Sequence, residues 1–217
     1  MLLRHQNLIW WIALVLIWSL SCVLDHSWLQ LDQRLPSWDQ AEYLSSAIEH
    51  GRQLGVLDQG RWEGFQALVD LSPKIPPLSS ILSGSLMAIV GQSPDQAGWI
   101  LSFWHGVLLL TVASWGRCIG GQRLGFLAAL FLAIAPGMAE HRVEFTLDLA
   151  LTGTTTLALF LLYRWQRPGS QGGQWPQAIV AATALAASVL TKQSALLVVA
   201  LPAIWAGLQA LREPKRS

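Results

Sequence analysis

Long apolar runs without a charged side chain recur along this chain of 217 residues. The first covers Leu8 to Leu24, and a helix of that length, at ~1.5 Å per residue, crosses most of a ~30 Å hydrocarbon core. Hydrophobic residues make up 53% of the chain and charged residues only 12%, against roughly 25% charged in soluble domains. The sequence therefore predicts an all-α, polytopic helical membrane protein. Its net charge of +1 and scattered basic residues indicate no nucleic-acid partner.

We expect about six transmembrane helices, at Leu8–Leu24, Ala97–Gly116, Leu124–Met138, Leu149–Trp165, Ala178–Thr191 and Ser194–Leu211. The last two are separate because one helix over residues 178–211 would place Lys192 near the middle of the membrane, so we expect a turn at Thr191–Ser194. The predicted division is a first span (1–24), an extracytoplasmic loop (25–96) and a five-span module (97–217).

The loop over residues 25–96 is polar but rich in tryptophan, which favours membrane interfaces. Ser37 and Gln40 have the spacing of a capping box, and the amphipathic helix that they begin is expected to end at Gly51 and Gly55. A second helix is predicted over Leu78–Val90, after two prolines. Its short, serine-rich apolar run indicates an interfacial or re-entrant helix.

The distribution of basic residues predicts which loops are cytoplasmic. If Leu78–Val90 does not cross the membrane, eight of the fourteen basic residues are cytoplasmic, and they are Arg4, Arg117, Arg123, Arg164, Arg167, Arg212, Lys215 and Arg216. If it crosses, most basic residues face outward, against the positive-inside rule. We therefore expect a multi-pass protein of the plasma (inner) membrane with both termini cytoplasmic.

Charged residues converge on the predicted outer face. They are Asp39 and Glu42 at helical spacing, Lys74 before a helix start, Glu140, His141, Arg142 and Glu144 with Asp148, and Lys192. Cations at a membrane surface can bind a lipid phosphate while a carboxylate activates an acceptor. Each residue also has an ordinary explanation, since an acid in a first helical turn such as Asp39 satisfies the helix dipole and a lysine can extend to the interface.

Four motifs in this order resemble the membrane glycosyltransferases of the GT-C type, in the protein mannosyltransferase and aminoarabinose transferase group. They are Trp38-Asp39-Gln40-Ala41-Glu42-Tyr43, Lys74-Ile75-Pro76-Pro77-Leu78, Arg142 to Asp148-Leu149, and Leu190-Thr191-Lys192. Family members are much longer, so the resemblance implies the N-terminal module of such an enzyme.

The resemblance implies a sugar donor carried on polyprenyl phosphate and transfer on the extracytoplasmic side, in building the cell envelope. It implies that Asp39 and Asp148 are catalytic carboxylates, and that Glu42, Tyr43, Lys74, Arg142 and Lys192 bind substrate. The family usually has a second acid where this chain has Gln40, so the motif does not predict a metal held by adjacent acids, and the sequence does not decide whether a divalent metal binds.

Two other functions stay open at this point. One is a non-catalytic subunit that binds lipid phosphate or assists assembly beside a partner membrane subunit. The other is a small transporter, which the near absence of ionisable residues within the spans disfavours.

Overall fold

The computed structural model describes residues 2–54, 62–72, 74–167 and 174–212, and these residues form helices with no strand, which confirms the all-α prediction. The described helices are α1 (Leu2–Leu31), α2 (Trp38–Gln53), α3 (Trp62–Asp70), α4 (Leu78–Val90), α5 (Pro94–Ile134), α6 (Pro136–Val143), α7 (Asp148–Gln166), α8 (Gln174–Thr191) and α9 (Ala195–Arg212).

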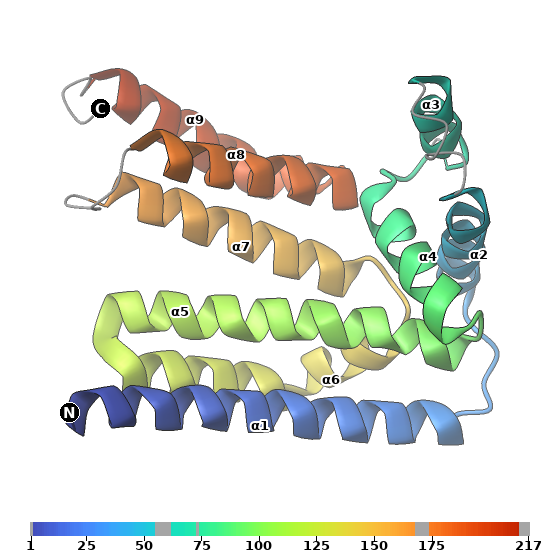
Figure 1. The fold of residues 1–217 in the computed structure, drawn as a ribbon, viewed down its shortest axis with the longest axis horizontal. Coiled ribbons are helices and arrows are strands. Elements are labelled where there is room, and N and C mark those ends of the chain that lie inside the picture. The colour runs from blue at the N-terminus through green and yellow to red at the C-terminus, as the bar shows by residue number, and fades with distance from the viewer. Residues whose placement is uncertain (1, 55–61, 73, 168–173, 213–217) are drawn as a thin grey trace.

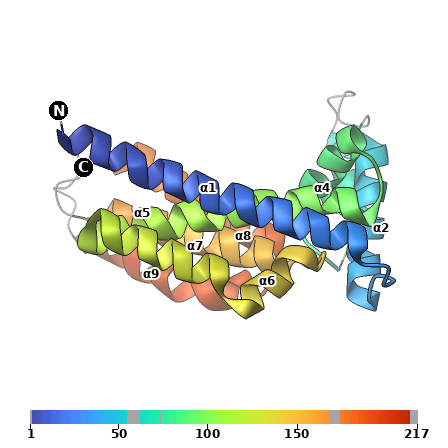
Figure 2. The same ribbon diagram turned by 90° about the horizontal axis from the view of Figure 1, so that it is seen from below.

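The long helices α1, α5, α7, α8 and α9 lie side by side in one bundle, and α2, α3 and α4 lie together at one end of it (Figure 1). The N-terminus of α1 and the C-terminus of α9 lie at the opposite end. Seen from below, α2 and α4 again sit at the end of the bundle away from both termini (Figure 2). The fold therefore has two distinct ends, one of them formed by the segment between α1 and α5.

Helix α5 folds back on itself at two glycines. Gly120 and Gly121 have non-helical backbone angles, and Gly121 has φ of 85°, a conformation that favours glycine. The two arms then touch backbone to backbone, because a Cβ added to Gly116 would lie 2.7 Å from the Cα of Gly125. The prediction of two helices separated by a turn in this region is confirmed.

Three described helices are long and apolar enough to cross a membrane, and they are Leu8–Leu31, Pro94–Ile134 and Ala195–Arg212. A fourth span results if α6 and α7, which are bent by 115° at their break, are taken together. The prediction of about six spans, with the two arms of α5 counted separately, stays a prediction. Helix α1 continues beyond the expected Leu24 to Leu31, so the segment 25–31 is helix and not loop.

Helices α2 and α4 cross at closely spaced backbones. A Cβ added to Gly51 would lie 2.7 Å from the carbonyl oxygen of Gly84, and Leu44, Ala47 and Met87 are buried beside this crossing. Leu78–Val90 is the helix that the sequence predicted. The expected capping box is wrong, since Ser37 makes no side-chain capping bond. The helix continues through Gly51 and ends at Gln53, and the second expected end residue, Gly55, lies outside the described residues.

Candidate functional site

An ion pair joins the start of α7 to the turn between α8 and α9. The Nζ atom of Lys192 donates to Oδ1 of Asp148 at 2.8 Å. Asp148 occupies the first turn of α7, where the helix dipole favours a carboxylate, and Lys192 directly follows the last residue of α8. Their side chains keep 45% and 34% of their surface exposed, so both can still reach a ligand.

Tyr43 brings the first motif next to this ion pair. Its side chain is half-buried on α2, and burial is the main cause that raises the pKa of the phenol above 10.0. The charge of Lys192 opposes this rise, while Asp39, Asp148 and Glu42 add to it. Electrostatic coupling of this kind requires short separations. Charges from α2, α7 and the α8–α9 turn therefore gather around one phenol.

Asp39 and Glu42 lie on α2 with exposed side chains, and Asp39 is the acid in its first turn. Lys74 is also exposed, ahead of α4, and it makes no hydrogen bond or ion pair within the described residues. The structure thus places Asp39, Glu42, Asp148 and Lys192 within electrostatic range of the Tyr43 phenol, but records no contact between Lys74 and this group.

Arg142 has a different environment from the one that a substrate-binding role implies. Its guanidinium donates from Nε to Oδ2 of Asp25 at 2.7 Å, from Nη2 to Oδ1 at 3.1 Å, and from Nη1 to the carbonyl of Ala133 at 2.8 Å. The two side chains are only 8% and 9% exposed. Removing one partner of such a pair leaves a buried charge without compensation. The pair joins α6 to α1.

The segment Glu140–Asp148 is partly helical. Glu140, His141 and Arg142 belong to α6, which ends at Val143, and not to an open loop as the sequence suggested. The Nδ1 atom of His141 is buried without a hydrogen-bond partner in the structure. Among the described residues, no group of three His, Cys, Asp or Glu side chains could hold a metal ion.

Sequence reasoning missed Asp25 as the partner of Arg142. The sequence did contain an indication of this pair. Asp25 lies inside a helix that continues with Ser27, Trp28 and Leu31, and a carboxylate inside a membrane helix needs a cation as partner. The expected end of the first span at Leu24 concealed it, since that boundary placed Asp25 in a loop. His105 was another buried polar residue, and neither of its ring nitrogens has a hydrogen-bond partner in the structure.

Comparison with known proteins gives one family. The chain matches the family described as dolichyl-phosphate-mannose-protein mannosyltransferase over residues 74–215, a range that includes Lys74, Arg142, Asp148 and Lys192 but not Asp39. No curated protein and no solved structure matches the chain. The match covers well over half of the sequence, and the charged turn at Lys192 and the acid at the start of α7 both fall within it. The chain belongs to the dolichyl-phosphate-mannose-protein mannosyltransferase family, whose members are glycosyltransferases of the GT-C type.

Proposed function

We propose that this multi-pass membrane protein is a glycosyltransferase, or the N-terminal module of one, that transfers a sugar from a polyprenyl-phosphate donor to an acceptor hydroxyl at the α2–α4 end of the bundle. The observation that carries the proposal is the group of charges around Tyr43, from Asp39, Glu42, Asp148 and Lys192. Family membership supports the reaction class, and the position of this group at one end of a helical bundle suits a lipid-linked donor.

The proposed chemistry is a single displacement at the anomeric carbon. The acceptor oxygen forms the new bond to this carbon, and its proton passes to the carboxylate of Asp39 as the general base. The bond between the anomeric carbon and the phosphate oxygen breaks at the same time, and its electron pair leaves with polyprenyl phosphate. Asp39 suits this role because its side chain is exposed and close enough to Tyr43 to influence the phenol.

Cations stabilise the phosphate as it departs. Lys192 is held toward the site by Asp148 at 2.8 Å, and Lys74 is an exposed cation at the same end of the bundle. Asp148 positions Lys192, and Tyr43, whose raised pKa keeps it protonated, donates a hydrogen bond to substrate. Glu42 contributes negative charge beside the acceptor. The buried Arg142 supports this site through Asp25 and does not touch substrate.

The test is transfer by membranes that contain the full chain. Polyprenyl-phosphate sugars, beginning with mannose and labelled in the sugar, are supplied, and both label transfer and release of polyprenyl phosphate are measured. We expect Asp39→Asn to lower transfer by about a hundredfold or more, because general base catalysis supplies ~10²–10⁴-fold. Binding of the labelled donor should stay close to that of the unchanged chain.

The matched control is Glu49→Gln, which neutralises another exposed acid of α2 that is not among the charges acting on Tyr43. It should leave transfer unchanged. Full activity of Asp39→Asn would exclude the proposed base. If the unchanged chain binds the donor and never turns it over, the non-catalytic lipid-phosphate-binding subunit becomes the better description.

A further inference from the structure

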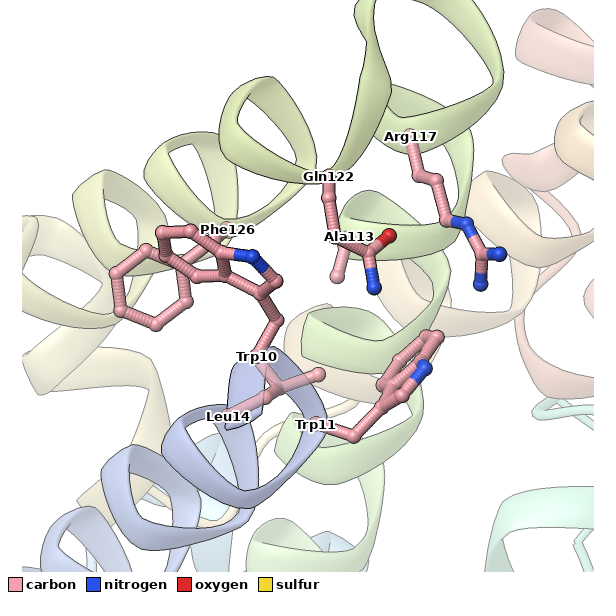
Figure 3. A pocket seen from close by; sticks show the side chains of 7 residues that line it. All are labelled: Trp10, Trp11, Leu14, Ala113, Arg117, Gln122 and Phe126. Atoms are coloured by element: carbon pink, nitrogen blue, oxygen red, sulfur yellow. The ribbon is translucent and has the colours of Figure 1, made fainter. Parts of the chain in front are cut away.

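A cleft lies at the opposite end of the bundle from the candidate site. It is a half-open surface cleft whose empty volume of about 250 Å³ includes open solvent, and it lies between the N-terminal part of α1 and the turn of α5. Its lining residues are Trp10, Trp11, Leu14, Ala113, Arg117, Gln122 and Phe126, and Figure 3 shows these side chains. The residues around Tyr43 contribute nothing to it.

The polar groups in this cleft are hydrogen-bond donors without an acceptor. The Nε2 atom of Gln122 is buried and has no hydrogen-bond partner in the structure. Arg117 forms no ion pair within the described residues, and its guanidinium lies 6.0 Å from the ring centre of Trp11. In Figure 3 the amide of Gln122 and the guanidinium of Arg117 face the same space above Trp11. A buried amide donor of this kind requires an acceptor.

The described residues supply no anion at this end of the bundle. Residues 5–24, 96–139 and 149–212 contain no Asp or Glu, and these stretches form α1 up to its Asp25, nearly all of α5, and α7 to α9. Exposed arginines at the same end, among them Arg123 and Arg164, add further positive charge. The missing acceptor must therefore come from outside the described residues.

The residues in and beside the cleft indicate where that anion comes from. Trp10 packs against Phe126 with ring centres 5.0 Å apart, and the neighbouring α1 residues Leu8 and Ile9 are 55% and 62% exposed. Tryptophan flanked by exposed aliphatic residues is typical of the boundary between lipid tails and headgroups. A basic, aromatic cleft at that depth suits an anionic lipid headgroup.

We propose that the cleft formed by Trp10, Trp11, Arg117 and Gln122 binds the phosphate of an anionic membrane lipid. Arg117 supplies a charged donor, the amide of Gln122 a neutral donor, and the two indoles pack against the apolar part of the headgroup region. This site is separate from the proposed glycosyl transfer, and its test requires no turnover.

The test measures lipid retention by the full chain purified in detergent. Native mass spectrometry counts bound dioleoylphosphatidylglycerol in a titration, with dioleoylphosphatidylcholine and inorganic phosphate as comparison arms. We expect Arg117→Gln to weaken phosphatidylglycerol binding about tenfold, since a hydrogen bond to a charged group contributes that much or more. Gln122→Glu, which keeps the side-chain shape and places a carboxylate in the cleft, should weaken binding at least as strongly.

Arg123→Gln is the matched control, because Arg123 is an exposed arginine near the same turn and does not line the cleft. Its affinity for phosphatidylglycerol should stay within about twofold of that of the unchanged chain. If Arg117→Gln and Arg123→Gln lose equal affinity for phosphatidylglycerol, the lipid responds only to general surface charge and the proposed site is wrong. Equal binding of phosphatidylcholine would remove the preference for an anionic lipid, and saturation by inorganic phosphate at the same concentrations would remove lipid as the source.

Discussion

Tyr43 is the residue through which the separate motifs of the candidate site influence one another. Its phenol lies on α2, yet its pKa depends on Asp148 of α7 and on Lys192 after α8 as well as on Asp39. Burial is the largest cause of the upward shift, and the carboxylates outnumber the cation among the charges. The phenol therefore stays protonated well into the alkaline range and can act as a hydrogen-bond donor.

This environment predicts how the Tyr43 phenol titrates. The folded chain holds the phenolic proton of Tyr43 more tightly than the unfolded chain does. The stability that this difference contributes is therefore present below pH 10 and is lost as pH rises through the raised pKa of Tyr43. Asp39→Asn and Asp148→Asn should each lower the pKa of Tyr43. The measurement is the ¹³Cζ tyrosine shift in NMR, in a Tyr163→Phe background that leaves one tyrosine.

Glu49→Gln again serves as control and should not move the titration midpoint, because Glu49 is not among the charges that act on Tyr43. An unchanged midpoint in both aspartate variants would mean that neither Asp39 nor Asp148 lies within electrostatic range of the Tyr43 phenol. That result would also remove the geometric support for Asp39 in the proposed reaction.

Single residues were predictable from the sequence to different degrees. Asp148 and Lys192 were placed on the same face by their positions at helix ends, and the 2.8 Å contact between them agrees with that placement. The sequence indicated that Asp25 needs a cation but did not single out Arg142 as its partner, because several acids could face Arg142 and only the three-dimensional path of α1 selects Asp25. Roles for all of these residues stay predictions.

At the scale of helices, the crossing of α2 and α4 depends on two glycines. A Cβ on Gly84 would lie 2.6 Å from the backbone nitrogen of Gly51, and side chains essentially never approach so closely. We expect Gly84→Ala to separate the helices and to destabilise the folded protein by about 1–3 kcal/mol, the usual cost of overpacking. The measurement is the midpoint of thermal unfolding in detergent.

Gly207→Ala is the control for this substitution. Gly207 lies within α9, and an added Cβ there would meet no atom within 4 Å. Alanine favours a helix over glycine by ~1 kcal/mol, so this variant should unfold at the same temperature or higher. A Gly84→Ala protein as stable as Gly207→Ala would contradict the close crossing.

Helix positions followed from apolar runs and prolines, whereas their ends and contacts did not. Leu78–Val90 was predicted with its observed bounds because two prolines precede it and Gly91 follows. Gly51 and Gly55 were expected to end α2, but the helix passes through Gly51, whose missing side chain allows another helix to approach. A sequence shows that a glycine is present, but tertiary packing decides whether it ends a helix or permits a contact.

At the scale of the whole molecule, the two ends of the bundle differ in charge. Acids and lysines of the candidate site lie at the α2–α4 end, together with the exposed Arg34 and Arg52. A larger set of exposed arginines lies at the end that holds both termini, namely Arg117, Arg123, Arg164, Arg167 and Arg212. The positive-inside rule then predicts that the end with more arginines is cytoplasmic and that the α2–α4 end is extracytoplasmic. This orientation is the one that the sequence predicted, and it rests on the same arginines.

Labelling of introduced cysteines tests the orientation. In a chain with Cys22→Ala and Cys118→Ala, Lys74→Cys and Arg123→Cys each introduce one thiol at an exposed position at opposite ends. A membrane-impermeant maleimide should label Lys74→Cys in intact cells with the outer envelope opened, and Arg123→Cys only after the inner membrane is permeabilised. The reverse pattern would place the candidate site in the cytoplasm, where Lys74 and Lys192 would meet a lipid phosphate of the opposite leaflet. Labelling of both thiols from one side would contradict the fold itself, because the turn of α5 and the start of α4 could not then lie at opposite ends of a bundle that crosses the membrane.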